Sequence, residues 1–216
     1  PDLVHQLNPW VPLPSRAPAV VTIHDLMPLL HPEWFSARHR LKFGAVLRHL
    51  RRSAHIVCVS RHVADLVVRH LDVPRDRVHP IHHGVHDSFR RPVEGPELDA
   101  VCARYGLERG GYLLSLGVMS AREDPSVVIE ALGGSTAPLG RVALVLTGPD
   151  RHGSARVRAA IDAHGLGERV CLAGFVDDAD LVPLLAGAAA LVHPSRDEGF
   201  GLTPLEAMAV GTPVIA

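Results

Sequence analysis

Short continuous apolar runs alternate along the chain with longer stretches in which apolar residues recur at helical spacing. In the first part of the sequence the apolar runs cover residues 3–7, 19–23, 55–59 and 78–83. Between them, two stretches place apolar side chains about one helical turn apart, at Phe43, Val46, Leu47 and Leu50 and at Val63, Leu66, Val67 and Leu71. Strands that are apolar throughout are typical of a parallel sheet covered by helices on both faces.

The same alternation returns in the second part. It predicts strands at 112–116, 142–146, 170–173, 188–192 and 213–216, and helices at 125–132, around 157–161, at 181–185 and at 205–210. Residues 26–35 are predicted to form a loop because they contain Pro28 and Pro32. We therefore predict an α/β chain of two Rossmann-like parallel-sheet domains, both incomplete. The expected divisions are 1–91, a linker at 92–108 that contains a short helix near 97–105, and 109–216.

Composition narrows the class of protein. The chain has 216 residues, of which 47% are hydrophobic and 21% charged, and this balance fits a globular protein with a real core. Its formal net charge of −1 gives no general attraction to nucleic acid. No apolar run approaches the ~20 residues that a membrane-spanning helix needs. The chain starts without Met and stops inside a predicted strand, so we expect a piece cut at both ends.

The cysteines carry no sign of a disulfide framework. Cys58, Cys102 and Cys171 are widely spaced, and Cys58 and Cys171 lie in apolar runs. Buried free thiols in a reducing compartment are the expectation. This points to a cytoplasmic protein.

The richest motif lies between residues 191 and 216. An apolar run ends at a loop in which Glu198 precedes Gly199, Phe200 and Gly201, and a helix then carries Glu206. Flexible glycines before a helix N-terminus suit a phosphate or a ring of hydroxyls, because backbone N–H groups and the helix dipole face the ligand.

Simpler interpretations of the two glutamates stay open. Thr203 is predicted to cap the helix, with Pro204 at its first position. Glu206 then has the spacing of a capping box and can serve only to bond the Thr203 N–H. Glu198 can be a solvated loop carboxylate.

The order of residues in this motif is more specific than its composition. The string P-S-R-D-E-G-F-G-L-T-P-L-E-A-M-A-V-G-T-P-V-I-A resembles the E-x7-E signature of retaining GT-B glycosyltransferases of family GT4. T-I-H-D-L-M-P-L-L-H-P-E-W-F, V-C-V-S-R-H-V-A-D-L and Y-L-L-S-L-G-V-M-S-A-R-E-D-P resemble segments of a mannosyltransferase-like branch. The resemblance covers nearly the whole chain.

The resemblance implies a fold and an activity. It implies two Rossmann-like domains facing a cleft, with the acceptor on the N-terminal side and the nucleotide sugar on the C-terminal side. The reaction it implies moves a sugar from a nucleotide diphosphate to an acceptor hydroxyl with retention of configuration. The nucleotide sugar is then a co-substrate, and neither a cofactor nor a metal ion is expected.

Residue roles follow from the same resemblance. Glu198 would hold hydroxyls of the donor sugar, Glu206 the ribose, and Arg122 the diphosphate, while His24 would line the cleft near the transferred sugar. Without the family context, the simplest interpretation of His24 is a packed residue at the end of a strand. Ser60 stands at the end of the next strand and is a candidate for the same edge. The predicted catalytic set is His24, Arg122 and Glu198, and the predicted donor-binding set is Gly117, Gly148, Gly199, Phe200, Gly201, Leu202 and Glu206.

The sequence also departs from the family pattern. Glu123 stands where a lysine usually contacts the diphosphate, and exchanging attraction for repulsion at about 4 Å changes the interaction by several kcal/mol. Val118 replaces an arginine that some branches also lack, and His83-Gly84-Val85-His86 replaces an N-G-V-D segment. The histidines at 79, 82, 83 and 86 suggest a zinc site, but strand alternation separates His82 from His83, so no metal site is expected.

Other functions stay open at this point. A degenerate GT-B domain that binds a sugar nucleotide or a partner without turnover is the main alternative, and Glu123 favours it. A related epimerase or phosphorylase, or a glycosidase using both glutamates, agrees less well with the motif. Arg48, Arg51 and Arg52 permit contact with a membrane surface, but a solvated helix face is the favoured explanation for them.

Overall fold

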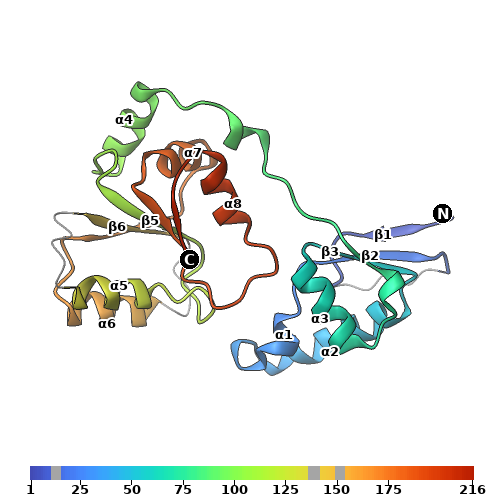
Figure 1. Ribbon diagram of the computed structural model, residues 1–216. Helices are drawn as coiled ribbons and strands as arrows, with labels where there is room; N and C mark the ends of the chain where they lie inside the picture. Colours follow the sequence, from blue (N-terminus) through green and yellow to red (C-terminus); the bar gives the residue numbers. More distant parts are fainter. Residues whose placement is uncertain (11–15, 136–141, 149–153) are drawn as a thin grey trace. The chain divides into compact units, whose positions relative to one another are not determined.

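The computed structural model describes residues 1–10, 16–135, 142–148 and 154–216 (Figure 1). Its contacts divide these residues into two compact units. The first comprises residues 1–84 together with 197–201, and the second comprises residues 85–196 and 202–216. Each unit has its own sheet and its own apolar core.

Among the residues described in the first unit, four parallel strands pair in chain order. They are β1 (Val4–Gln6), β2 (Ala19–Ile23), β3 (His55–Cys58) and β4 (Val78–Pro80). The helices α1 (Met27–Leu30), α2 (Ala37–Arg52) and α3 (Arg61–Leu71) lie on one side of this sheet in Figure 1. Short 3₁₀ turns cover Pro32–Trp34 and Arg75–Arg77.

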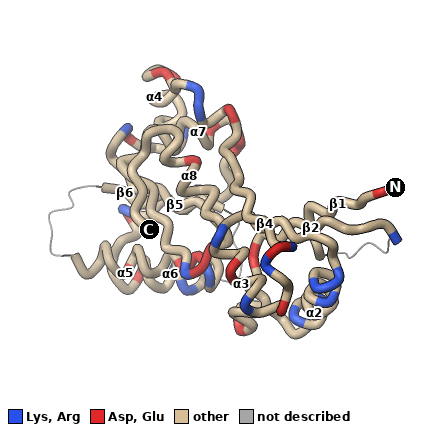
Figure 2. The backbone as a smooth tube through the Cα atoms, turned by 45° about the vertical axis from the view of Figure 1, so that its right-hand side comes forward, with Lys and Arg blue, Asp and Glu red and all other residues tan. Residues whose placement is uncertain are grey.

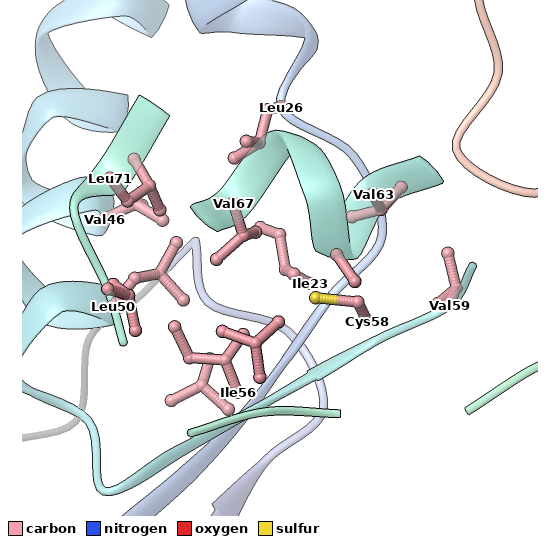
Figure 3. Close-up of a cluster of buried hydrophobic side chains, with 14 of the residues drawn as sticks. Ile23, Leu26, Val46, Leu50, Ile56, Cys58, Val59, Val63, Val67 and Leu71 are labelled. Carbon is pink, nitrogen blue, oxygen red and sulfur yellow. The ribbon is translucent and has the colours of Figure 1, made fainter. Parts of the chain in front are cut away.

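The core of the first unit forms where the apolar faces of α2 and α3 meet alternate positions of the strands (Figure 3). Phe43, Val46 and Leu50 are buried, as their spacing predicts, and Leu47 is partly buried. In β3 the burial alternates, so Ile56 faces the core while His55 is exposed. Side-chain hydroxyls begin both long helices, because the hydroxyl of Ser36 accepts from His39 N–H and that of Ser60 from Val63 N–H.

Two local predictions in this unit are wrong. Residues 26–35 contain α1 and a 3₁₀ turn instead of a plain loop. Pro28 is tolerated there because it lies in the first turn of α1, where a backbone N–H has no partner within the helix. The run 78–83 is a strand only as far as Pro80, whose missing N–H ends regular pairing.

The second unit, over its described residues, has five parallel strands in the order β7-β6-β5-β8-β9. They are β5 (Tyr112–Leu116), β6 (Ala143–Thr147), β7 (Val170–Gly174), β8 (Ala190–Val192) and β9 (Val214–Ile215). From β5 the chain builds outward through β6 to β7, and then returns to place β8 on the other side of β5. The direction of winding therefore reverses between β5 and β8.

Helices cover both faces of this sheet in Figure 1. The helices α5 (Ser126–Gly134) and α6 (Ser154–Ala163) pack on one face, with Ile129 and Val157 in the core they form. The helices α4 (Gly95–Arg104), α7 (Asp178–Gly187) and α8 (Leu202–Ala209) lie on the other, with Leu184 and Ala207 buried beneath them. A 3₁₀ turn at Asp87–Arg90 precedes α4. The predicted linker at 92–108 thus contains a helix that packs in the core of the second unit.

The thiols are chemically quiet. In the described structure Cys58, Cys102 and Cys171 are free, and the first two are buried while Cys171 is half-buried. Burial raises the pKa of Cys58 to about 12, so this thiol stays protonated and unreactive at neutral pH.

Tyr112 provides a direct test of the second core. Its side chain is fully buried in β5, and its hydroxyl donates to the Leu184 carbonyl of α7 over 2.6 Å. Tyr112→Phe keeps the ring and leaves that buried carbonyl without its donor, so we expect a loss of about 1–3 kcal/mol in unfolding free energy. Chemical denaturation of both proteins measures the difference, and equal midpoints would contradict the assigned bond.

Candidate functional site

The residues directly after β5 and β6, Gly117 and Gly148, touch each other at the carboxyl edge of the second sheet. Gly117 ends β5 with φ of 144°, and Gly148 follows β6 with φ of 113°. A Cβ atom built on Gly148 would lie 1.9 Å from the Gly117 carbonyl oxygen, so the backbone contact leaves no room for a side chain. Such an edge, next to the β5/β8 reversal, is where open parallel sheets bind ligands.

Glu123 folds back beneath this loop. A Cβ atom on Gly117 would lie 2.8 Å from Glu123 Oε2, and the Glu123 side chain is only 14% exposed. The neighbouring Arg122 guanidinium donates to the Glu123 carboxylate. The acid that replaces the expected lysine therefore lies against Gly117 and pairs with Arg122, the cation that the resemblance assigns to the diphosphate.

Asp124 is the next acid along the chain and is also buried. Its carboxylate accepts from the Ser126 hydroxyl and pairs with Arg156 at 3.2 Å and Arg196 at 2.8 Å. The sequence predicts Pro125 at the first position of a helix capped by Asp124, but α5 begins one residue later, at Ser126. The Asp124 carboxylate binds these side chains rather than acting only as a cap.

The helix α8 begins earlier than the sequence predicts. It starts at Leu202, directly after Gly201, whose φ of 81° lets the chain turn sharply into the helix. Thr203 is therefore the second residue of α8 and not its N-cap, and the prediction that Pro204 is the first helical residue is wrong. A capping box between Thr203 and Glu206 needs Thr203 at the cap, so this simpler account of Glu206 does not hold.

Glu206 is a half-buried carboxylate near the start of α8. Burial raises its pKa, and no hydrogen bond or ion pair reaches its carboxylate from the residues that the structure describes. A partly desolvated carboxylate without a donor is costly to the fold. Hydroxyl groups of a bound ligand would remove that cost by donating to it.

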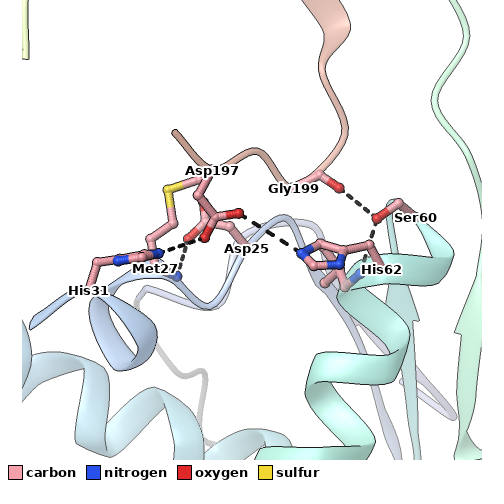
Figure 4. Close-up of polar contacts among 8 residues, drawn as sticks. Asp25, Met27, His31, Ser60, His62, Asp197 and Gly199 are labelled. Atoms are coloured by element: carbon pink, nitrogen blue, oxygen red, sulfur yellow. Dashed lines mark hydrogen bonds and ion pairs between the residues drawn. The ribbon is translucent and has the colours of Figure 1, made fainter. Parts of the chain in front are cut away.

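The segment Asp197–Gly201 belongs to the first unit, and Figure 4 shows its polar contacts. The Asp197 carboxylate pairs with His31 at 3.0 Å and lies 3.9 Å from His62 Nε2. The Ser60 hydroxyl donates to the Gly199 carbonyl over 2.6 Å. Ser60, a strand-end candidate in the sequence, thus holds this segment as well as capping α3.

The next two residues of the segment fit closely against the first unit. A Cβ atom on Gly199 would lie 1.9 Å from the His24 carbonyl oxygen, so only glycine fits there. The Phe200 ring packs on the apolar core and meets the His83 ring edge-on at a centroid distance of 5.3 Å. Glu198 itself is half-buried.

His24 stands at the end of β2 with both ring nitrogens engaged. Its Nε2 is 3.1 Å from the Leu7 carbonyl oxygen, and its Nδ1 is 3.4 Å from His83 Nε2. Because a carbonyl only accepts, the His24 Nε2–H donates to Leu7, and Nδ1 is the ring nitrogen that faces His83. The two rings stack at an interplanar angle of 12°.

The structure thus places the predicted residues in two groups. His24, Glu198, Gly199, Phe200 and Gly201 lie in the first unit, whereas Gly117, Arg122, Gly148, Leu202 and Glu206 lie in the second. The sequence did not predict the contact between His31 and Asp197 in the first unit. It also did not predict that Arg156 and Arg196 pair with Asp124 in the second. No spacing signal marks Arg156, while Arg196 lies inside the motif itself.

The described residues hold no group of three or more His, Cys, Asp or Glu side chains able to bind a metal ion. In the group near residue 80, His79 instead contacts His55 at 3.0 Å and His83 contacts His24. His82 packs against Phe200, and His86 contacts the Ser88 hydroxyl. Over the same residues, no helix is both long and apolar enough to cross a membrane.

Comparison with models of protein families assigns the chain to a family. Residues 104–216 match the model of glycosyl transferases group 1, and residues 1–89 match the model of glycosyltransferase family 4. The chain belongs to the group 1 glycosyltransferases. The family resemblance inferred from the E-x7-E motif is thereby confirmed.

Individual relatives agree with the family. The chain is 32% identical to the 2-deoxystreptamine N-acetyl-D-glucosaminyltransferase of Streptomyces fradiae, over 99% of this chain and 54% of that protein. It is 30% identical to the O-antigen chain mannosyltransferase B of Escherichia coli, over 94% of this chain and 54% of that protein. It therefore spans about half the length of these two relatives.

Solved structures confirm the predicted fold of two Rossmann-like units. The structure of Anabaena HepE in complex with UDP and glucose matches 93% of this chain and 53% of its own, with a TM-score of 0.78 and 22% identity. The sucrose-phosphate synthase of Thermosynechococcus elongatus matches 100% of this chain and 55% of its own, with a TM-score of 0.79 and 22% identity.

The contact between the two glycine loops is open to direct test. Gly148→Ala places a Cβ against the Gly117 carbonyl oxygen at a positive φ, so we expect it to destabilise the protein by more than about 1 kcal/mol. Gly134→Ala, in α5 of the same unit, is the matched control because its Cβ would meet nothing within 4 Å. Thermal unfolding of both variants measures the effect, and equal stability would refute the close approach.

Proposed function

We propose that the protein is a retaining glycosyltransferase that moves a sugar from a nucleotide-diphosphate sugar to an acceptor hydroxyl. The observation that carries the proposal is Glu206, a half-buried carboxylate near the start of α8 that none of the described residues contacts by a hydrogen bond or ion pair. Family membership and the sugar-transferring relatives support it. The complex of HepE with UDP and glucose supports a nucleotide sugar as the donor.

The chemical demand of this reaction is to stabilise the departing diphosphate as it gains negative charge. Preorganised backbone N–H groups, helix N-termini and cationic side chains do this without reorganising at the moment of reaction. Gly117 and Gly148 are in close backbone contact, so the backbone groups of these two residues are preorganised. Transfer without a metal ion is part of the proposal and is supported by the family resemblance.

The roles of single residues follow the motif. Glu206 accepts hydrogen bonds from the ribose, Glu198 accepts from hydroxyls of the donor sugar, and His24 lies near the transferred sugar. Leu7 and His83 fix the orientation of the His24 ring. The backbone of Gly199, Phe200, Gly201 and Leu202 supplies further donor contacts.

A screen of nucleotide sugars on the full-length protein tests the proposal. Calorimetry measures which nucleoside diphosphate binds, and NMR of the product measures the anomeric configuration. We expect binding, release of nucleoside diphosphate in the presence of an acceptor, and retention. Tight binding without transfer to any acceptor would favour a binding module instead, and the absence of any nucleotide binding would refute the proposal.

Glu206→Gln separates the proposed role from packing. The variant keeps the shape but loses the charge, so we expect affinity for the nucleoside diphosphate to fall by about 1.5–3 kcal/mol. Glu130→Gln, an exposed change on α5, is the control and should leave affinity unchanged. Unaltered affinity in Glu206→Gln would remove Glu206 from the site.

The raised pKa of Glu206 predicts that Glu206→Gln, which should weaken nucleotide binding, will stabilise the fold. A carboxyl whose pKa is raised on folding stabilises the fold below the pKa of the unfolded chain, and this contribution is lost as the pH rises through the folded pKa. At neutral pH the charged group is therefore a burden on the fold, so Glu206→Gln should unfold at a higher denaturant concentration than the wild type. Near pH 3 the two midpoints should converge.

Peripheral contact with an anionic membrane surface is a further part of the proposal. Figure 2 shows basic residues gathered along α2, which carries no Asp or Glu. Leu41 on this helix is 81% exposed and could insert into a membrane surface. Arg51 also has a structural contact, because its guanidinium donates to the Leu71 carbonyl. The basic residues of α2 are Arg38, Arg40, Lys42, Arg48, Arg51 and Arg52.

Sedimentation with vesicles tests this contact. A combined Arg38→Gln, Leu41→Gln and Arg48→Gln variant should bind phosphatidylserine vesicles less than the wild type, because charge and an inserted apolar side chain both contribute to such binding. Phosphatidylcholine vesicles are the control and should bind neither protein strongly. Equal binding of the variant to the anionic vesicles would refute a role for α2.

A further inference from the structure

We propose that Arg156 and Arg196, held together on the buried Asp124 carboxylate, form the cationic contact for the diphosphate of the donor. They would replace the lysine that the family places at position 123. This inference rests on the proposed function, because it names the residues that would hold one part of the same ligand. The contacts around Asp124 carry it.

One carboxylate serves two guanidinium groups. Asp124 Oδ2 lies 3.2 Å from Arg156 Nη1 and 2.8 Å from Arg196 Nη2, and Asp124 is only 4% exposed. The two arginine side chains are 60% and 51% exposed. A single arginine would already balance the charge of Asp124, so the second leaves a net positive charge at the surface.

The neighbouring pair does not cancel this charge. Arg122 and Glu123 carry opposite charges and contact each other directly. The charge left over at the start of α5 therefore comes from the arginines on Asp124. Each guanidinium has five N–H donors in a planar fork, a geometry that matches two oxygens of a phosphate group.

The cluster lies where a diphosphate would be bound. Arg196 follows β8, and its backbone N–H donates to the Arg122 carbonyl in the loop after β5 over 3.0 Å. Arg156 is in the first turn of α6, which follows β6. The cluster therefore stands at the carboxyl edge of the sheet that carries Gly117 and Gly148, and at the positive N-terminal ends of α5 and α6.

A purely structural role makes a different prediction. If the arginines serve only to satisfy Asp124, then removing one of them lowers stability and leaves anion binding unchanged. If they bind the diphosphate, then losing either weakens binding of any diphosphate, with or without a nucleoside. Inorganic pyrophosphate is therefore a discriminating probe.

The test compares Arg156→Gln and Arg196→Gln with the wild-type full-length protein by calorimetry. We expect each variant to bind both the nucleoside diphosphate and inorganic pyrophosphate roughly tenfold or more weakly, with a smaller dependence on salt. Arg158→Gln, on the same helix and exposed, is the control for charge. Arg196→Lys keeps the charge and should retain more affinity than Arg196→Gln.

The outcomes separate this inference from the function. Unchanged pyrophosphate and nucleotide affinity in both glutamine variants would overturn the inference and leave the proposed function intact. Absence of nucleotide binding in the wild type would overturn both. Should a glutamine variant fail to fold, the salt dependence of the wild type and the affinity of Arg196→Lys still decide, since salt-independent pyrophosphate binding would contradict a cationic contact.

Discussion

The close approach of two backbone segments, at Gly117 and Gly148, is the constraint on which the second unit of this structure depends. Parallel strands deliver their carboxyl ends to one edge, and there the Gly148 backbone meets the Gly117 carbonyl with no space for a Cβ atom. This contact fixes where the chain leaves β5 and β6. Glu123 lies against Gly117 beside this contact, and Asp124 pairs with Arg156 and Arg196 in the same unit.

A second constraint of the same kind operates in the first unit. Gly199 lies against the His24 carbonyl, and the Ser60 hydroxyl donates to the Gly199 carbonyl. Glycine is required in both places because the backbone itself occupies the space that a side chain would need. These glycines therefore serve the close packing of the backbone.

Much of the fold was predictable because long apolar runs and helical spacing are strong signals. The strands at Ala19–Ile23 and Tyr112–Leu116 follow directly from their sequences, and Phe43, Val46 and Leu50 face the core as expected. The family followed from the order of residues around Glu198 and Glu206. The start of α8 was not predicted correctly, because Thr203 and Pro204 have the sequence pattern of a capped helix N-terminus. The helix instead begins directly after Gly201, whose φ is positive.

The side-chain contacts at the candidate site could not be predicted from the sequence. Nothing in the spacing reveals that Glu123 turns under Gly117 within the loop after β5. Nor does it reveal that Arg156 and Arg196 meet on Asp124, since they follow β6 and β8, the two strands that flank β5. The predicted roles of Glu198, Arg122 and His24 likewise depend on a ligand and stay predictions. The structure adds the contacts that His24 makes with Leu7 and His83 and that Arg122 makes with Glu123.

The most direct test is a crystal structure of the full-length protein with the nucleoside diphosphate that binds it. The account predicts ribose hydroxyls within hydrogen-bonding distance of Glu206 and phosphates at the Gly117 loop. A nucleotide bound away from the carboxyl edge of β5, with the Glu206 carboxylate still uncontacted, would contradict it.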